Sequence, residues 1–222
     1  MLKRTPDKII VFAGPSLHKI DEQLVESSKI LVYPPVKRGD ISSLTAAFPP
    51  GNIAIVDGIF HSYPAVGHAE MLTAVRKGWN IWGLSSMGAI RACEMQRLGV
   101  RGFGEVYRRF TQDPEMSDDE VTLLHQAQAP YLPISEPLVH IREFLKHCQA
   151  KGHITPNQAQ STAHTLKHMW YGYRTLSRLR EEMVKLAVPK DRIDILFSDF
   201  SQHRVKTKDL IDFLKLRPWA EE

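Results

Sequence analysis

The chain has 222 residues, 43% of them hydrophobic, and its mean hydropathy is −0.26. This length and composition suffice for one sizeable core, or for a core with a helical extension, and they exclude a chain that is disordered throughout. No stretch approaches the roughly 20 apolar residues that span a bilayer, and Met1–Asp7 lack the apolar run of a secretory signal. We therefore expect a cytoplasmic protein with no membrane partner.

The formal net charge is +4 at pH 7, with a pI near 9.0. A mildly basic chain attracts acidic proteins or nucleic acid through long-range electrostatics. Here the basic residues of the last third alternate with apolar residues at helical spacing, so we interpret them as a solvated helix face and expect no nucleic-acid partner. These residues are Arg174, Arg178, Arg180, Lys185, Arg204, Lys206 and Lys208.

Short apolar runs alternate with helical patterns in the first half of the chain. The runs are Ile9–Phe12, Ile30–Tyr33, Ile53–Val56 and Asn80–Leu84. Continuous apolar runs of this length are typical of parallel strands that are covered on both faces. Within Ala65–Lys77 apolar residues recur every three positions, which predicts an amphipathic helix. The order of strand, helix and strand predicts an α/β fold, with an open, mostly parallel sheet in the N-terminal half.

The second half is predicted to be helical. Pro137 stands near the first position of one helix, and Thr155 with Gln158 has the pattern of a capping box that starts another. From there an apolar stripe continues in steps of three and four residues for about seven turns, which indicates core or a partner-helix interface. The stripe consists of Ala163, Leu166, Met169, Tyr173, Leu176, Leu179, Met183 and Leu186.

Two further patterns complete the second half. Asp118-Asp119-Glu120 either binds a cation or caps a helix that begins near Val121, and the cap is favoured. A last helix is predicted after Thr207, with Leu210, Ile211 and Leu214 facing inward. We place an α/β core at residues 1–127 and a helical extension, packed on that core, at residues 128–222.

The strongest candidate for a site is the turn that follows the fourth apolar run. In an open parallel sheet, ligands bind at the carboxyl ends of the strands. Ser86 lies where a helix begins, so its hydroxyl is expected near free backbone N–H groups and the positive end of the helix dipole. The segment resembles a nucleophile elbow, but Leu84 occupies the first Gly position of G-x-S-x-G relative to Ser86. On spacing alone, a plain helix N-cap at Ser85 or Ser86 is favoured.

An acid and an imidazole, Asp57 and His61, follow the third run. An Asp that orients a His, which in turn serves a serine, is a common way to activate a hydroxyl group. The alternative is a simple turn at Asp57 and a surface histidine at His61. No metal site is predicted, because His61 and His68 lack the i, i+4 spacing of a zinc-binding helix. Gly14, Ser16 and Asp40 complete the same edge, as ligand contacts or as turn residues.

Five segments in this order resemble the TfuA family: Gly14–Ser16, Pro34–Pro35 with Arg38–Asp40, Asp57–Gly58 with Phe60, Ser85–Ala92 with Glu94, and Asp118–Val121. The resemblance covers about residues 9–126. The helical remainder from about Gln128 resembles no family that we identify, and we expect it to set the partner or the oligomeric state.

The resemblance implies a role in peptide backbone thioamidation. TfuA proteins accompany a YcaO enzyme, which activates a backbone amide of a precursor peptide or protein with ATP so that sulfur replaces the amide oxygen. ATP and magnesium are therefore expected at the YcaO partner, and no cofactor is expected in this chain. The resemblance also implies that the protein releases sulfide from a thiocarboxylated, ThiS-like carrier.

Sulfide release of this kind is acyl transfer to water, which needs a nucleophile or activated water and donors for an oxyanion. We assign Ser86 as the nucleophile or as the residue that positions water, and His61 or Asp57 as base or orienter. Backbone N–H groups near Met87 and Gly88 are the expected oxyanion donors.

The other candidate contacts of the carrier are Gly14, Ser16, Asp40, Ser85 and Arg91. Arg91 either pairs with Glu94, three residues later, or binds a carboxylate-like group of the carrier tail. The two cysteines, Cys93 and Cys148, lack the spacing of a disulfide framework or a metal site and are expected as free thiols. Cys93 is expected in the core, although a persulfide is the alternative in sulfur chemistry.

Two rival functions stay open. The protein could be a non-catalytic module that recruits or activates YcaO, for which the long apolar stripe would supply a docking face. It could also be a serine esterase unrelated to sulfur. That class has the chain order Ser, Asp, His, whereas Asp57 and His61 both precede Ser86.

Overall fold

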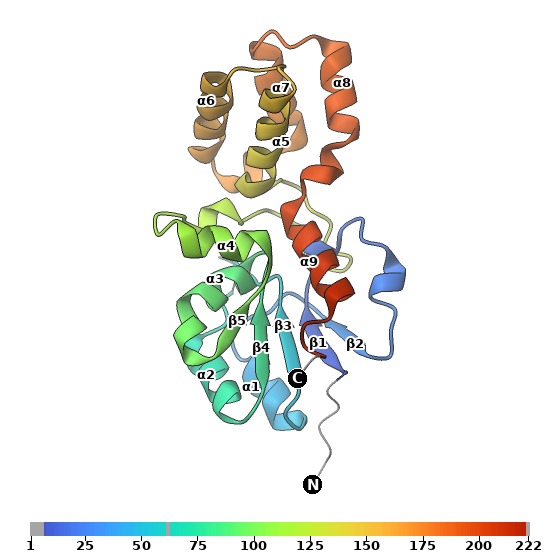
Figure 1. The fold of residues 1–222 in the computed structure, drawn as a ribbon, viewed down its shortest axis with the longest axis vertical. Helices are drawn as coiled ribbons and strands as arrows, with labels where there is room; N and C mark the ends of the chain where they lie inside the picture. The colour runs from blue at the N-terminus through green and yellow to red at the C-terminus, as the bar shows by residue number, and fades with distance from the viewer. Residues whose placement is uncertain (1–6, 61–62, 221–222) are drawn as a thin grey trace. The chain divides into compact units, whose positions relative to one another are not determined.

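The computed structural model describes residues 7–60 and 63–220 and confirms the predicted α/β fold (Figure 1). The chain divides into two compact units. The first comprises Met1–Met116 with Lys206–Glu222, and the second comprises Ser117–Val205. Within the described residues, none of the helices has the length and apolar character needed to cross a bilayer.

A parallel sheet of five strands, in the order β2-β1-β3-β4-β5, forms the centre of the first unit. The strands are β1 (Ile9–Phe12), β2 (Ile30–Tyr33), β3 (Asn52–Ile55), β4 (Asn80–Gly83) and β5 (Val100–Gly102). The four predicted runs all form strands, with bounds within one residue of the prediction. The analysis of the sequence missed β5, because three residues of which only Val100 is buried carry no apolar run.

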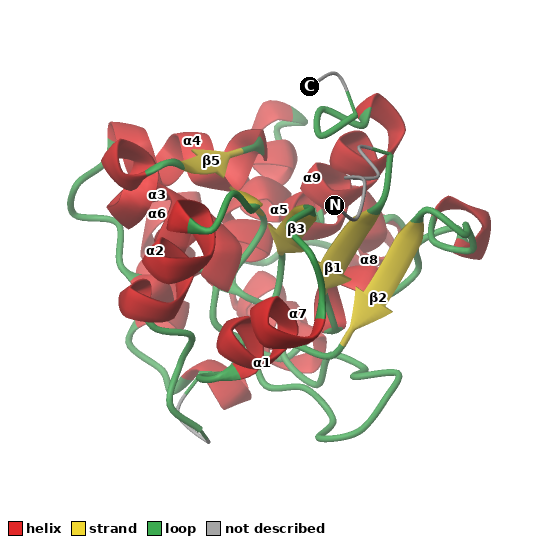
Figure 2. Cartoon of the chain, turned by 90° about the horizontal axis from the view of Figure 1, so that it is seen from below, coloured by secondary structure: helices red, strands yellow, loops and turns green. Residues whose placement is uncertain are grey.

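Helices cover both faces of this sheet, as the continuous apolar strands predict (Figure 2). Ile10 and Phe12 of β1 pack in the cluster that holds α1 (Asp40–Ala47), α2 (His68–Arg76) and α3 (Met87–Met95). Their neighbours Ile9 and Val11 point to the other face, because side chains alternate along a strand, and they pack in the cluster that contains α9 (Val205–Leu216). Helix α4 (Gly104–Gln112) lies next to α3.

Helix α9 is the last helix that the sequence predicts, and it begins at Val205. Leu210 and Leu214 are buried as expected, whereas Ile211 is partly exposed. Phe213 anchors the helix on the sheet, with its ring 5.7 Å from the ring of Trp82, in an edge-on arrangement. An aromatic pair of this geometry stabilises the packing beyond its buried area.

The second unit is helical, as predicted. It contains α5 (Leu138–Ala150), α6 (Pro156–Lys167), α7 (Leu176–Lys185) and α8 (Lys190–Ser198), which bury a common apolar core. The capping box that starts α6 is confirmed. The backbone N–H of Gln158 donates to the Thr155 hydroxyl oxygen (3.2 Å), and the backbone N–H of Thr155 donates to the Gln158 side chain (2.8 Å).

Short 3-10 helices connect these elements. They are η1 (Pro15–Leu17), η2 (Glu22–Leu24), η3 (Gln96–Leu98), η4 (Asp118–Glu120), η5 (Tyr171–Tyr173) and η6 (Phe200–His203).

The long apolar stripe does not form one helix. The chain leaves the helix after Lys167 and starts α7 anew at Thr175, whose hydroxyl accepts the backbone N–H of Arg178 (3.1 Å). The buried guanidinium of Arg174 stabilises the break, because it donates to backbone carbonyls at the end of α6, including that of Leu166 (2.9 Å). Tyr173, which the stripe places in the core, is 67% exposed.

The interpretation of the basic residues as a solvated helix face is wrong for Arg174, Arg204 and Lys206, which are buried. Each lies close to a carboxylate, and a buried charge is tolerated when it is paired and hydrogen-bonded. Arg174 donates to Asp119, 2.8 Å away, and Arg204 donates to Glu136. Lys206 lies near Asp57, a residue of the loop after β3.

The prediction of a helix that begins near Val121 is also wrong, because the 3-10 helix η4 ends there instead. Glu120 is buried, and its two carboxylate oxygens accept hydrogen bonds from the guanidinium of Arg142, each 2.8 Å long. Asp119 and Glu120 therefore bind the guanidinium groups of Arg174 and Arg142 rather than capping an α-helix.

Candidate functional site

Asp57 lies two residues after the end of β3 and binds the loop that follows β1. Its Oδ2 accepts the backbone N–H groups of Gly14 and Ser16, both at 2.9 Å, and its Oδ1 accepts the Ser16 hydroxyl at 2.8 Å. The structure thus brings three predicted site residues together. These three hydrogen bonds hold the loop after β1 against the carboxylate of Asp57.

Lys206, in the first turn of α9, is a member of this site that the sequence analysis missed. Its Nζ lies 3.7 Å from Oδ1 of Asp57, which is an ion-pair distance longer than a direct hydrogen bond. A signal was available in the sequence, because Lys206 precedes Leu210 by four residues and Phe213 by seven. This spacing puts Lys206 on the apolar face of the helix.

Two glycines let α3 begin against the strands. A Cβ atom on Gly83 would lie 2.0 Å from the carbonyl oxygen of Gly88, and one on Gly88 would lie 1.6 Å from the carbonyl oxygen of Ile55. Neither position accepts a side chain. The backbone of the β4–α3 turn, Leu84–Ser86, is therefore held tightly at the carboxyl end of the sheet.

The two serines of the β4–α3 turn have different roles. Ser85 has a φ of +62°, the strained conformation of an elbow, and its hydroxyl donates to the backbone carbonyl of Lys206 at 2.8 Å. When G-x-S-x-G is aligned on Ser85, its first glycine position is Gly83. Its second glycine position is occupied by Met87, so the pattern is met only in part. Ser86 is the N-cap residue of α3, yet its side chain makes no capping hydrogen bond.

The two predicted oxyanion donors, the backbone N–H groups of Met87 and Gly88, differ in whether they already have an acceptor. The backbone N–H of Gly88 donates to the carbonyl of Val56 at 3.3 Å. Met87 is the first residue of α3, where a backbone N–H has no acceptor within the helix. The N–H of Met87 is therefore the better placed donor, and the positive end of the helix dipole lies beside it.

Other predicted residues have local contacts. Oδ2 of Asp40 accepts the backbone N–H of Lys37 at 2.9 Å, which is turn chemistry at the start of α1. Arg91 pairs with Glu94 at 2.6 Å, as one of the two interpretations expected, and also donates to the carbonyl of Val66 at 3.0 Å. His61 lies outside the described residues.

Five buried residues, which follow β1, β3 and β4 or lie in the first turn of α9, are called the Asp57 cluster here. Every member is 2% exposed or less. Its members are Ser16, Asp57, Ser85, Ser86 and Lys206. Among the described residues, no three histidine, cysteine or acidic side chains are grouped to hold a metal ion.

A family model described as TfuA-like protein matches residues 57–175, just over half of the chain. The matched region begins at Asp57 and includes the whole β4–α3 turn. It also continues beyond residue 126 into the helical unit, a part that the sequence motifs did not assign to any family. A comparison with curated proteins finds no match.

Proposed function

Because the chain belongs to the TfuA-like family, whose members are accessory proteins of YcaO-type enzymes, we propose that it hydrolyses a thiocarboxylated ThiS-like carrier. The sulfide released in this way supplies YcaO-dependent thioamidation of a precursor peptide or protein. Family membership itself implies the association with a YcaO-type enzyme. The hydrolytic activity, the carrier and the residues that act on it are our proposal.

The observation that carries the proposal is the position of Ser86. Its hydroxyl is buried at the N-terminus of α3, next to the N–H of Met87, and it makes no capping bond there. A hydroxyl at a helix N-terminus is well placed to attack a carbonyl carbon, because the developing oxyanion meets backbone N–H groups and the helix dipole. Ser85 is less suited to attack, since its hydroxyl is held by Lys206.

In the proposed reaction, the oxygen of Ser86, or of a water molecule that Ser86 positions, forms a bond to the thiocarboxylate carbon. The bond from that carbon to sulfur then breaks, and sulfur leaves with the electron pair, takes up the proton that the attacking hydroxyl gave up, and departs as hydrosulfide, HS⁻. When Ser86 is the nucleophile, water cleaves the resulting ester. In both cases one water is consumed and the carrier ends in a carboxylate.

Asp57 supports this reaction as an orienting group. Its hydrogen bonds to Gly14 and Ser16 fix the loop after β1 beside the β4–α3 turn. In this proposal His61 is the proton acceptor, a role that is common for histidine near neutral pH.

The test is sulfide release from a thiocarboxylated ThiS-like carrier, incubated with the purified protein in the absence of YcaO. Wild type is compared with Ser86→Ala and with Ser43→Ala, an exposed serine of α1 that serves as the matched control. We expect the first variant to lose about a hundredfold or more in rate and the second to behave as wild type. Full activity of a folded Ser86→Ala variant overturns the assignment of Ser86.

A second candidate is a non-catalytic activator of YcaO, and the burial of the Asp57 cluster favours it. If wild type releases no sulfide alone, and thioamidation by YcaO still rises when it is added, the activator is the better account. Turnover of simple esters, without any action on the thiocarboxylated carrier, would instead indicate an esterase unrelated to sulfur.

A further inference from the structure

We propose that an exposed aromatic turn of the helical unit docks an acidic segment of the YcaO-type partner. The turn joins α6 to α7 and carries Trp170 and Tyr173, and Lys167 lies just before it at the end of α6. These three residues, with His164 and His168, are called the Trp170 patch. The inference rests on the association with a YcaO-type enzyme and does not depend on the proposed hydrolysis.

Two neighbouring aromatic rings of this turn lie in water. Trp170 is 51% exposed and Tyr173 is 67% exposed, and their ring centroids are 5.2 Å apart in an edge-on arrangement. Single exposed apolar side chains are common on protein surfaces, whereas adjacent large ones mark an interaction surface. Tryptophan and tyrosine are also among the residues that contribute most to binding at protein interfaces. The exposed pair therefore has the composition of a docking site.

The turn is held in one conformation by the rest of the helical unit. The buried guanidinium of Arg174 donates to the backbone carbonyls of Lys167 (3.1 Å) and Met169 (2.9 Å), just before the turn. A Cβ atom on Gly172 would lie 2.2 Å from the ring of Trp170, so this ring packs directly on the backbone of the turn. Aromatic groups that are fixed in advance lose little conformational entropy on binding, which favours affinity.

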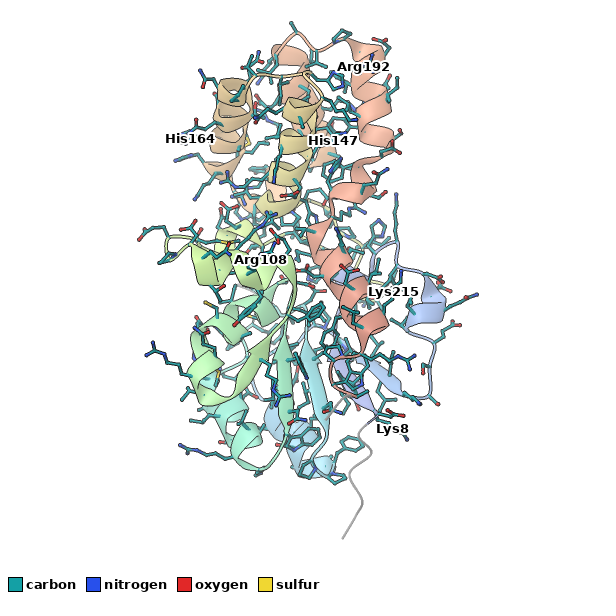
Figure 3. All side chains as sticks on the ribbon, viewed as in Figure 1. Lys8, Arg108, His147, His164, Arg192 and Lys215 are labelled. Atoms are coloured by element: carbon teal, nitrogen blue, oxygen red, sulfur yellow. The ribbon has the colours of Figure 1, made fainter. Side chains whose placement is uncertain are left out.

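Helix α6 extends the patch with polar side chains. The exposed rings of His164 and His168 are 4.1 Å apart, and Figure 3 labels His164 on this helix. Nδ1 of His168 lies 2.9 Å from the backbone carbonyl oxygen of His164, which positions the ring at the end of the helix. The exposed side chain of Lys167 belongs to the same turn of α6. Aromatic rings beside polar groups match the apolar centre and polar rim of a protein interface.

The charge around the patch selects an acidic partner. Residues 144–180 contain no aspartate or glutamate, but they contain six lysine or arginine residues and four histidines. Two acids from earlier in the chain approach this region. Asp119 accepts a hydrogen bond from Arg174, and its charge is thereby balanced. Glu120 is balanced in the same way by Arg142. An acidic segment therefore complements this surface, and like-charged partners are disfavoured.

A protein partner is favoured over nucleic acid. Aromatic rings beside cations also suit single-stranded nucleic acid, but such binding depends on many lysine or arginine contacts with phosphates. Among the described cations of residues 144–180, the exposed ones are Lys146, Lys151 and Lys167, and the arginines are buried or half-buried. The TfuA-like family model ends at residue 175 and so includes both exposed rings, and the family associates with a protein, the YcaO-type enzyme.

The experiment measures binding of the purified cognate YcaO-type enzyme to the full chain by isothermal titration calorimetry. Trp170→Ala and Tyr173→Ala test the aromatic rings. Tyr63→Ala is the matched control, because Tyr63 is 60% exposed and lies in the first unit. Lys167→Gln tests the charge, and Lys190→Gln, at an exposed lysine of α8, is its control.

We expect the Kd to rise at least about tenfold in Trp170→Ala and in Tyr173→Ala, and to stay within about twofold of wild type in Tyr63→Ala. Lys167→Gln should weaken binding about two- to fivefold at low salt, and this difference should vanish near about 0.5 M salt. Lys190→Gln should bind as wild type does. Circular dichroism and thermal unfolding establish which variants fold.

Two results of this titration would overturn the inference. One is a wild type that does not bind the YcaO-type enzyme, a measurement that needs no variant. The other is a folded Tyr173→Ala variant with wild-type affinity. This variant is the safer test of the surface, since the Tyr173 side chain is mostly exposed, whereas the Trp170 ring also packs on the turn.

A labelled single-stranded RNA separates the two classes of partner. RNA binding that is lost in Trp170→Ala, while binding of the YcaO-type enzyme is unchanged, would assign the patch to nucleic acid and overturn the inference. No sulfur carrier is present in these titrations. A wild type that releases no sulfide would therefore refute the proposed hydrolysis alone and would not alter the docking result.

Discussion

The hydroxyl of Ser85 donates a hydrogen bond to the backbone carbonyl of Lys206, 2.8 Å away, although 121 residues separate the two. This bond joins the β4–α3 turn to the first turn of α9. Ser85 makes it while holding a φ of +62°, a conformation that costs a residue with a side chain roughly 1–2 kcal/mol. Substitutions of Ser85 can therefore separate the stabilisation by this hydrogen bond from the cost of the strained φ.

The Ser85→Ala variant should unfold with a free energy lower by about 1–3 kcal/mol, because a buried carbonyl loses its donor. The Ser85→Gly variant loses the same bond but relieves the strained φ, so it should be more stable than Ser85→Ala by about 1 kcal/mol. Urea unfolding of both variants tests this order. Equal stability of wild type and Ser85→Ala would show that the bond contributes nothing.

Gly88→Ala should prevent stable folding. The added Cβ would lie 1.6 Å from the carbonyl oxygen of Ile55, which is backbone of the central strand β3 and cannot turn aside. The loss of stability should be more than about 4 kcal/mol, among the largest for single substitutions. Gly51→Ala is the control, since the nearest atom, on the Trp79 ring, would be 3.7 Å away. A Gly88→Ala protein with normal thermal stability would contradict the described turn.

Asp209 of α9 makes stability depend on pH. Its carboxylate accepts the backbone N–H groups of Glu105 (2.7 Å) and Val106 (2.9 Å) at the start of α4. Burial raises the pKa of Asp209 from 3.8 to about 7, despite the opposing hydrogen bond from Val106. Between these values the folded state holds a proton that the unfolded state has released. The stabilising contribution is therefore complete below pH 3.8 and is lost as the pH rises to about 7.

The measurement compares the free energy of unfolding of wild type and Asp209→Asn from pH 4 to pH 8. The difference between the two proteins should change by at most about 1.4 kcal/mol per pH unit across the window and should be flat above it. The variant is less stable overall, because its amide group accepts fewer hydrogen bonds from α4. A difference that does not change with pH would place the pKa of Asp209 outside this range.

Cys93 should not carry sulfur. Its thiol is partly buried and donates to the carbonyl of Phe110 at 3.5 Å, and burial, with Glu94 beside it, raises its pKa. The thiolate is the reactive form, so a raised pKa lowers reactivity near neutral pH. Burial raises the pKa of Cys148 still further, to about 12. Cys93→Ser should keep the wild-type rate of sulfide release, and a persulfide on Cys93 in mass spectra would contradict this.

Several features followed from local sequence alone. The strands β1 to β4 were predictable, because a short continuous apolar run has few other stable environments than a sheet covered on both faces. The capping box at Thr155 was predictable for the same kind of reason, since both of its hydrogen bonds form within four residues. Gly83 and Gly88 marked the tight turn before α3, and Asp57 marked the end of β3.

The rest of the site depended on residues far apart in sequence. The apolar stripe of the helical half predicted burial correctly for Leu166 and Leu179, but periodicity does not reveal a break that the side chain of Arg174 stabilises from outside the helix. The charge of Lys206 likewise predicted that its side chain is exposed. Its spacing from the apolar residues of α9 predicted the opposite, a buried position. Which preference prevails is decided by whether an acid such as Asp57 lies within reach, and only the tertiary structure sets that distance.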